Sequence, residues 1–179
     1  MSRKIKSLIA VIVIIVFMVP AAFHTADATD ISGNSLVKTN TFITLFSLYD
    51  LTLGGGHELS LEDMHITHFT NDALAKTVYH GCEVLSLTTN QELTEINSII
   101  VSMATNVKNA SQYTVDFTML FMKTLLAAGI EYDTVSDILT TVGESIENGN
   151  DIQMIVDGVQ ITGSITNYST ITFNIEKAK

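Results

Sequence analysis

The longest hydrophobic run of the chain lies close to its N-terminus. It covers residues 8–23 and follows a short basic stretch at residues 2–6. A basic segment, an apolar segment and a small-x-small motif make up a secretory signal peptide, and the sequence ADA at residues 26–28 supplies the motif. We therefore predict a signal peptide over residues 1–28, cleaved after this motif, and an exported domain over residues 29–179. The alternative is an uncleaved membrane anchor, although the run is shorter than the roughly 20 apolar residues that span a bilayer comfortably.

Apolar residues recur at helical spacing in the middle of the chain. The pattern predicts helices over residues 89–107, 111–128 and 133–148, and the first of these opens on TNQE, a capping-box sequence. The second segment is apolar on nearly all sides, so we expect it to be the central buried helix. A shorter helix is predicted from an Asn71 cap to a Gly81 stop.

The spacing of apolar residues changes from 3.6 to 2 after residue 150, which is the period of a strand. Residues 152–156 and 159–165 flank Asp157-Gly158, a dipeptide favoured in two-residue hairpin turns because both positions tolerate positive φ. Residues 170–176 alternate in the same way. The C-terminal part is therefore predicted to be a three-stranded β-meander.

Residues 36–69 fit two patterns, strand alternation and a helical stripe formed by Phe42, Leu45, Phe46 and Tyr49. The many Thr, Ile, Phe and Tyr residues in residues 41–52 favour strands. We predict one strand there and a second over residues 57–69, on the two sides of the glycine loop at residues 54–56, with a further strand over residues 83–87. Taken together, these elements predict a single α+β domain in which about three helices pack on a mainly antiparallel sheet.

The charge of the exported domain restricts its partners. It contains six lysines, no arginine and 18 acidic residues, a net charge of about −12. Nucleic acids are bound through clusters of Lys and Arg, so no nucleic-acid partner is expected, and membrane contact is expected only through the N-terminal segment if it is not cleaved. Cys82 is the only cysteine, so it cannot form an intrachain disulfide, and we expect it to be a buried thiol.

Four of the five histidines, His57, His65, His68 and His80, fall within residues 56–82. Imidazole nitrogens are ligands of zinc and copper, so these four residues form a candidate metal site. The spacing of His65 and His68 would place both rings on one face of a helix but on opposite faces of a strand. The metal hypothesis thus conflicts with the strand prediction, and the alternative is scattered surface or half-buried histidines with no cofactor.

Two Asn-x-Ser sequons begin at Asn109 and Asn167, in predicted turns where a glycan could be attached. No catalytic motif accompanies them. We favour a non-enzymatic binding, adhesion or assembly module that is secreted or held at the outer face of the cell membrane, with other cell-surface or extracellular proteins as partners. The alternatives are an extracytoplasmic metal-binding protein that uses the His57 to His80 cluster, and a small secreted hydrolase.

Overall fold

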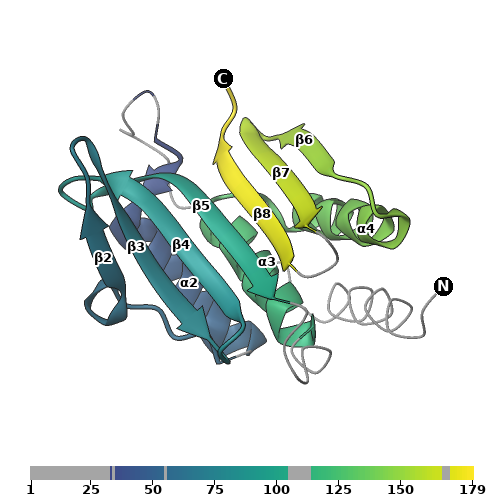
Figure 1. Ribbon diagram of the computed structural model, residues 1–179, viewed down its shortest axis with the longest axis horizontal. Helices are drawn as coiled ribbons and strands as arrows, with labels where there is room; N and C mark the ends of the chain where they lie inside the picture. The colour runs from purple at the N-terminus through teal and green to yellow at the C-terminus, as the bar shows by residue number, and fades with distance from the viewer. Residues whose placement is uncertain (1–32, 34, 55, 105–113, 167–169) are drawn as a thin grey trace.

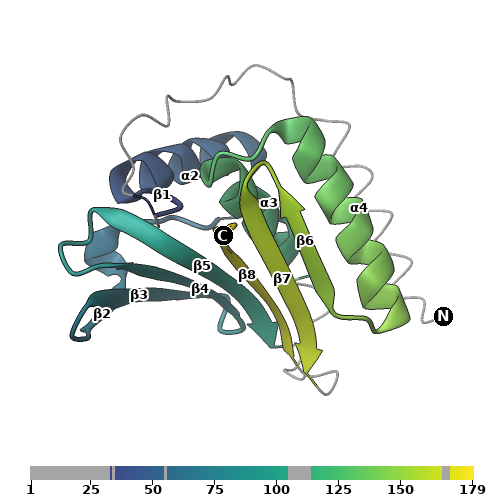
Figure 2. The same cartoon turned by 90° about the horizontal axis from the view of Figure 1, so that it is seen from above.

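A strongly curved antiparallel sheet carries the helices on one of its two faces (Figures 1 and 2). The computed structural model describes residues 33, 35–54, 56–104, 114–166 and 170–179. Three helices and eight strands are present in these ranges, so the predicted α+β class and single domain are confirmed. In chain order the elements are β1 (Val37–Lys38), α2 (Thr39–Leu53), the 3-10 turn η1 (Leu61–Asp63), β2 (His65–His68), β3 (Asp72–Tyr79), β4 (Glu83–Asn90), β5 (Glu95–Ala104), α3 (Thr114–Ala127), α4 (Tyr132–Asn148), β6 (Ile152–Val156), β7 (Val159–Thr166) and β8 (Thr170–Lys177).

The strand order is β2-β3-β4-β5-β8-β7-β6, and the short β1 pairs with β5 beyond the end of β8. The chain thus builds two meanders, each preceded by a helix. The last strand of the first meander, β5, pairs with the last strand of the second, β8. This pairing joins the two halves of the chain into one sheet, and α3 lies behind the seam (Figure 1).

The core lies between the sheet and the helices, because alternate strand residues point to the helical face. Leu85 and Leu87 of β4 are fully buried there. Phe121 of α3 stacks on Phe173 of β8 with ring centroids 4.3 Å apart. Gly163 of β7 lies against Phe173, since a Cβ at this glycine would come within 2.7 Å of the ring. The aromatic contacts therefore fix α3 on the second meander.

The strand predicted before the glycine loop is wrong, because Thr39–Leu53 forms the helix α2. Its buried residues include Phe42, Phe46 and Tyr49, which follow the helical stripe that the sequence also offered. Burial of this stripe on the core outweighs the β-favouring composition, which is a weak preference. Of the second strand predicted in this region, only His65–His68 is observed, as β2.

The helix predicted over residues 89–107 is also wrong, since Glu95–Ala104 forms the strand β5. The buried residues of β5 include Ile96, Ile99 and Val101. A bulge shifts the register opposite Thr88 and Thr89, and a bulge adds one residue to a strand. Because of the extra residue, the buried Ile96 and Ile99 are three positions apart, as they would be in a helix, and not two.

The capping-box sequence at the start of that segment forms a hairpin turn instead. The side-chain oxygen of Asn90 accepts hydrogen bonds from the backbone N–H groups of Thr94 and Glu95, at 2.8 and 3.1 Å. Asn serves tight turns in this way as readily as it serves helix starts. The capping-box sequence therefore belongs to the turn between β4 and β5 and does not begin a helix.

The short helix predicted between Asn71 and Gly81 is the strand β3. Ala73, Ala75 and Tyr79 are buried at even spacing, whereas Lys76 and Val78 are exposed. Alanine is the best helix former, but, proline aside, helix propensities differ by less than about 1 kcal/mol per residue, so burial in a sheet overrides them. Gly81 does end the element, but as part of the turn into β4.

The other predicted elements are confirmed. The helices α3 and α4 and the strand over residues 83–87, which lies within β4, are present, and the C-terminal meander consists of β6, β7 and β8. Asp157 and Gly158 have φ of 52° and 75°, as the hairpin turn requires. No helix in the described ranges is long and apolar enough to cross a membrane. The predicted signal peptide and the sequons at Asn109 and Asn167 lie outside the described residues.

Candidate functional site

Five polar side chains meet between α2, α3 and the hairpin that joins β3 to β4. They are Asp50, His57, His80, Glu83 and Lys123, and we call them the polar centre. The side chains of His57, Glu83 and Lys123 have no exposed surface, whereas 14% of Asp50 and 32% of His80 are exposed. Charged groups are seldom buried in this way unless they are paired. The polar centre therefore brings together the buried charged side chains of the described core.

Lys123 of α3 is the innermost cation of the polar centre. Its ammonium donates to the carboxylate of Asp50, to the carbonyl oxygen of Gly54 at 2.9 Å and to Nδ1 of His57 at 2.9 Å. The ring of Phe46 lies beneath it, with the centroid 5.4 Å from Nζ. An ammonium has three N–H donors, so three acceptors satisfy it completely. Burial nevertheless lowers the pKa of Lys123, while its hydrogen bond to Asp50 and the negative charges around it act in the opposite direction.

His57 connects Lys123 to Glu83. Because Nδ1 accepts from the ammonium, the hydrogen-bond pattern assigns the ring proton to Nε2, which faces Oε2 of Glu83 at 3.4 Å. The backbone N–H of His57 donates to Asp50 at 3.0 Å, and its ring meets Tyr79 edge to face at 4.8 Å. These contacts hold the ring in one orientation.

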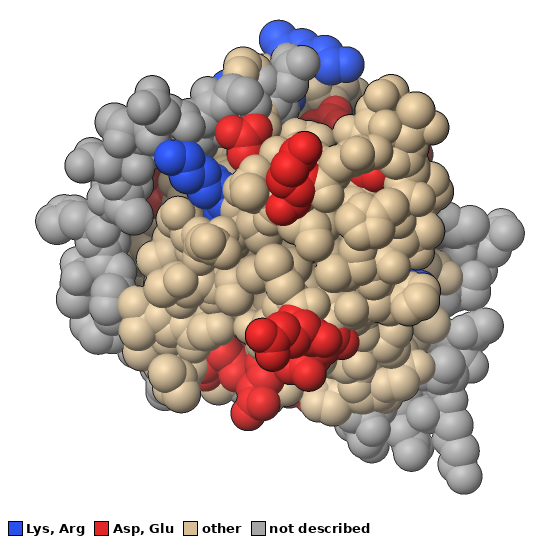
Figure 3. Space-filling model, turned by 90° about the vertical axis from the view of Figure 1, so that its left-hand side faces the viewer, with Lys and Arg blue, Asp and Glu red and all other residues tan. Residues whose placement is uncertain are grey.

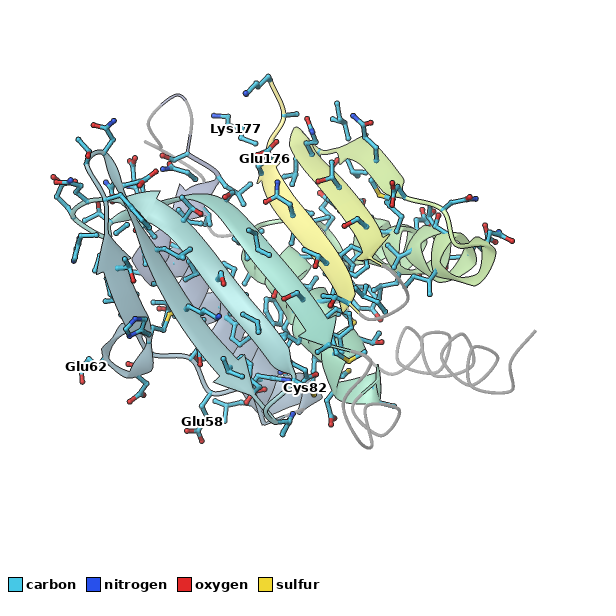
Figure 4. All side chains as sticks on the ribbon, in the orientation of Figure 1. Glu58, Glu62, Cys82, Glu176 and Lys177 are labelled. Atoms are coloured by element: carbon cyan, nitrogen blue, oxygen red, sulfur yellow. The ribbon has the colours of Figure 1, made fainter. Side chains whose placement is uncertain are left out.

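His80 lies at the surface end of the polar centre. Its Nδ1 is 2.6 Å from Oε2 of Glu83. His80 and Gly81 have φ of 51° and 72°, and a positive φ is uncommon for residues other than glycine, although Asn, Asp and His adopt it more often than the rest. The strained backbone of this turn places the imidazole beside the carboxylate, and such strain is concentrated at functional sites. Cys82, labelled in Figure 4, shows where the turn between His80 and Glu83 lies.

Glu83 is the buried acid between the two histidines. Both rings approach its Oε2, while Oε1 is buried and has no hydrogen-bond partner among the residues that the structure describes. Leaving a buried polar atom unsatisfied costs about 1–3 kcal/mol. A buried carboxylate that contacts two imidazoles through Oε2 and has no partner at Oε1 has the chemistry to take part in binding a cation.

Two of the four predicted metal ligands belong to the polar centre and two do not. His57 and His80 are brought together, with ring centroids 5.6 Å apart. His65 and His68 are exposed on β2, three residues apart in a strand, so that they point to opposite faces. The strand prediction had already implied that these two rings could not bind one metal, and the observed strand agrees with it.

Sequence reasoning missed the other three members, Asp50, Glu83 and Lys123. The available signal was Lys123, a single cation in the most apolar helical segment, which needs a buried partner.

Three residues of the polar centre have the geometry of a metal site. One ligand atom from each of His57, His80 and Glu83 lies within 4.8 Å of the others, and within the described ranges this is the group with the donors and the spacing that a metal needs. Zinc and copper are the ions that such a nitrogen and oxygen set suits.

The neighbouring groups do not extend the polar centre. Cys82 is buried, as expected, and burial raises the pKa of its thiol. Glu58 and Glu62 are exposed and point outward at the margin of the molecule (Figure 4). The side of the molecule that bears β2 is largely uncharged, with acidic side chains in small groups and few lysines (Figure 3).

Comparisons of the chain with known protein families, with curated proteins and with solved structures find no match.

Proposed function

We propose that this protein is an exported, non-enzymatic binding domain, and that it binds a divalent transition metal through His57, His80 and Glu83. The observation that supports the proposal is the convergence of one ligand atom from each residue within 4.8 Å. The three residues come from a loop, a strained turn and a strand. The fold must bring them together, since only His80 and Glu83 are close in the sequence.

The distances between the ligand atoms are compatible with a small adjustment on metal binding. Two ligands of a tetrahedral zinc, each about 2.1 Å from the ion, lie roughly 3.4 Å apart. The distance from Nε2 of His57 to Oε2 of Glu83 is already 3.4 Å. The 2.6 Å contact between His80 and Glu83 is a hydrogen bond and has to open. His80 can make this movement because a third of its side chain is exposed.

A metal that also reached Oε1 of Glu83 would give this buried oxygen a partner. Oε1 has no partner in the described part of the chain, and a buried carboxylate is stable only when it is paired or bound to a metal. Zinc sites with three protein ligands keep a fourth position for water or another small ligand. The exposed edge of His80 is the side from which the ion and this fourth ligand would enter.

Zinc is the first candidate and copper the second. Both ions accept imidazole nitrogen, and copper has the higher intrinsic affinity for nitrogen and oxygen sites. Calcium and magnesium are less suitable because they prefer oxygen ligands. Location outside the cytoplasm, which the N-terminal sequence pattern supports, would give the site access to whichever of the two ions the surroundings supply.

The experiment is a calorimetric titration of the purified protein with zinc and, separately, with copper. We expect one equivalent to bind. His80→Gln and Glu83→Gln should each weaken binding at least tenfold, because the loss of even an outer-shell partner of a metal typically costs ten- to a hundredfold in affinity. His65→Gln is the matched control, because it removes an exposed histidine of the same sequence region that lies away from the polar centre.

The proposal fails if the wild-type protein binds neither ion, or if His65→Gln weakens binding as much as His80→Gln does. Circular dichroism of each variant establishes that it is folded. Hydrolysis of ester or peptide substrates by the zinc-loaded protein would contradict the non-enzymatic part of the proposal and favour the secreted hydrolase.

A further inference from the structure

Lys123 contacts His57 in a way that is unusual for a metal ligand. A histidine that binds a metal through one ring nitrogen almost always donates the N–H of the other to a carboxylate, a carbonyl group or water. Here the other nitrogen, Nδ1, faces an ammonium donor at 2.9 Å. In this state Nε2 carries the proton, so the nitrogen that points at Glu83 has no lone pair for a metal.

We infer that Lys123 is a positioning residue that competes with the metal for His57, holding the ring in its metal-free state until an ion displaces the Lys123–His57 hydrogen bond. The inference rests on the proposed metal function and concerns the regulation of the same site. His57 keeps one ring proton throughout, and this proton moves from Nε2 to Nδ1 when Nε2 becomes a ligand. The ammonium must then turn away from the ring.

The contacts of Lys123 make both states accessible. Two of its three acceptors, the Asp50 carboxylate and the Gly54 carbonyl, do not belong to the metal ligand set. They keep the ammonium bound when His57 is withdrawn. What the metal has to displace is therefore one hydrogen bond from a charged donor, and the affinity of the site is reduced by the strength of that bond.

The test compares zinc affinity in the wild-type protein and Lys123→Met, measured by competition with a chromophoric zinc chelator. Methionine is also unbranched, is one atom shorter than lysine, and removes the donor. We expect Lys123→Met to bind zinc at least tenfold more tightly, which corresponds to 1.4 kcal/mol. The double variant Asp50→Asn/Lys123→Met serves if the single one is unstable, because it leaves no unpaired carboxylate. Lys76→Met, on the exposed face of β3, is the control that changes the net charge by the same amount.

The nitrogen chemical shifts of His57 give a second measurement that a purely structural role of Lys123 would not alter. In the metal-free wild type, Nδ1 should have the shift of an acceptor and Nε2 that of an N–H, and zinc should exchange the two. The same exchange should occur at lower zinc concentration in Lys123→Met.

The outcomes separate this inference from the proposed function. If the wild type binds zinc and Lys123→Met binds it no more tightly, the competition is refuted while the metal site stands. If the variant binds zinc and the wild type does not, Lys123 blocks the site and the proposed function of the wild type is wrong. If neither protein binds zinc or copper, both are refuted.

Discussion

The contact between Asp50 and Lys123 provides the sharpest stability prediction. Asp50→Asn keeps the shape of the side chain and its acceptor oxygen but removes the acid that, among the residues the structure describes, directly contacts the fully buried ammonium of Lys123. Breaking a buried ion pair by removing one partner costs about 3–5 kcal/mol. We expect a loss of about 3 kcal/mol, at the lower end, because 14% of Asp50 is exposed and the new amide oxygen can still accept.

The loss should depend on pH, and its direction follows from Lys123. Burial lowers the pKa of this group from its ordinary value of 10.5, and the contacts with Asp50 raise it again. Without Asp50 the pKa of Lys123 falls further. The buried charge destabilises the fold below that lowered pKa, and the cost disappears as the pH rises from it towards 10.5. The deficit of Asp50→Asn relative to the wild type should therefore shrink at alkaline pH.

Urea unfolding of the wild type, Asp50→Asn and Asp137→Asn at pH 7 and at pH 9.5 measures both effects. Asp137 is exposed on α4, so Asp137→Asn should change the free energy of unfolding by less than about 0.5 kcal/mol. A loss in Asp50→Asn no larger than this control would refute the buried ion pair. A deficit that grows with pH would refute the sign of the linkage.

Two further predictions concern the core and the thiol. Gly163→Ala places a Cβ 2.7 Å from the ring of Phe173, which is held by stacking on Phe121, so it should lower the free energy of unfolding by about 1–3 kcal/mol in urea unfolding. Gly33→Ala, with nothing within 4 Å, should change it little, and equal midpoints for the two variants would contradict this packing. Burial raises the pKa of the Cys82 thiol above its ordinary 9.0, so a thiol reagent should label the native protein far more slowly than the unfolded one, and rapid native labelling would be incompatible with a buried thiol. The stability that this shift supplies is complete below pH 9.0 and is lost as the pH rises through the raised pKa.

Local sequence patterns predicted the fold where one periodicity had no competitor. The meander of β6, β7 and β8 alternates strictly and turns at Asp157-Gly158. Of the two helices before it, α3 is apolar on nearly all sides and α4 combines an apolar face with a glycine stop. The pattern failed at β5, where a bulge opposite Thr88 and Thr89 gave a strand the spacing of a helix. It also failed at α2, where two periodicities overlapped and only tertiary burial decides between them.

The site could be predicted only in part, for a related reason. Histidines are recognisable in a sequence as candidate metal ligands, and two of the four predicted ones, His57 and His80, lie in the polar centre. Glu83 is hard to single out in the sequence because an acid at the start of a strand is ordinarily exposed. Glu83 joins the polar centre because His57 links it to Lys123, which lies 40 residues further along the chain. Such pairings depend on topology, which local patterns do not contain.

The most direct test of the metal site is X-ray absorption spectroscopy at the zinc edge of the protein loaded with one equivalent of zinc. We predict a first shell of nitrogen and oxygen atoms at about 2.0–2.2 Å, with the scattering pattern of two imidazoles and no sulfur. The same spectrum from His80→Gln should lose one imidazole. A sulfur ligand at about 2.3 Å, which only Cys82 or a methionine could supply, or a wild-type spectrum without imidazole scattering, would contradict binding through His57, His80 and Glu83.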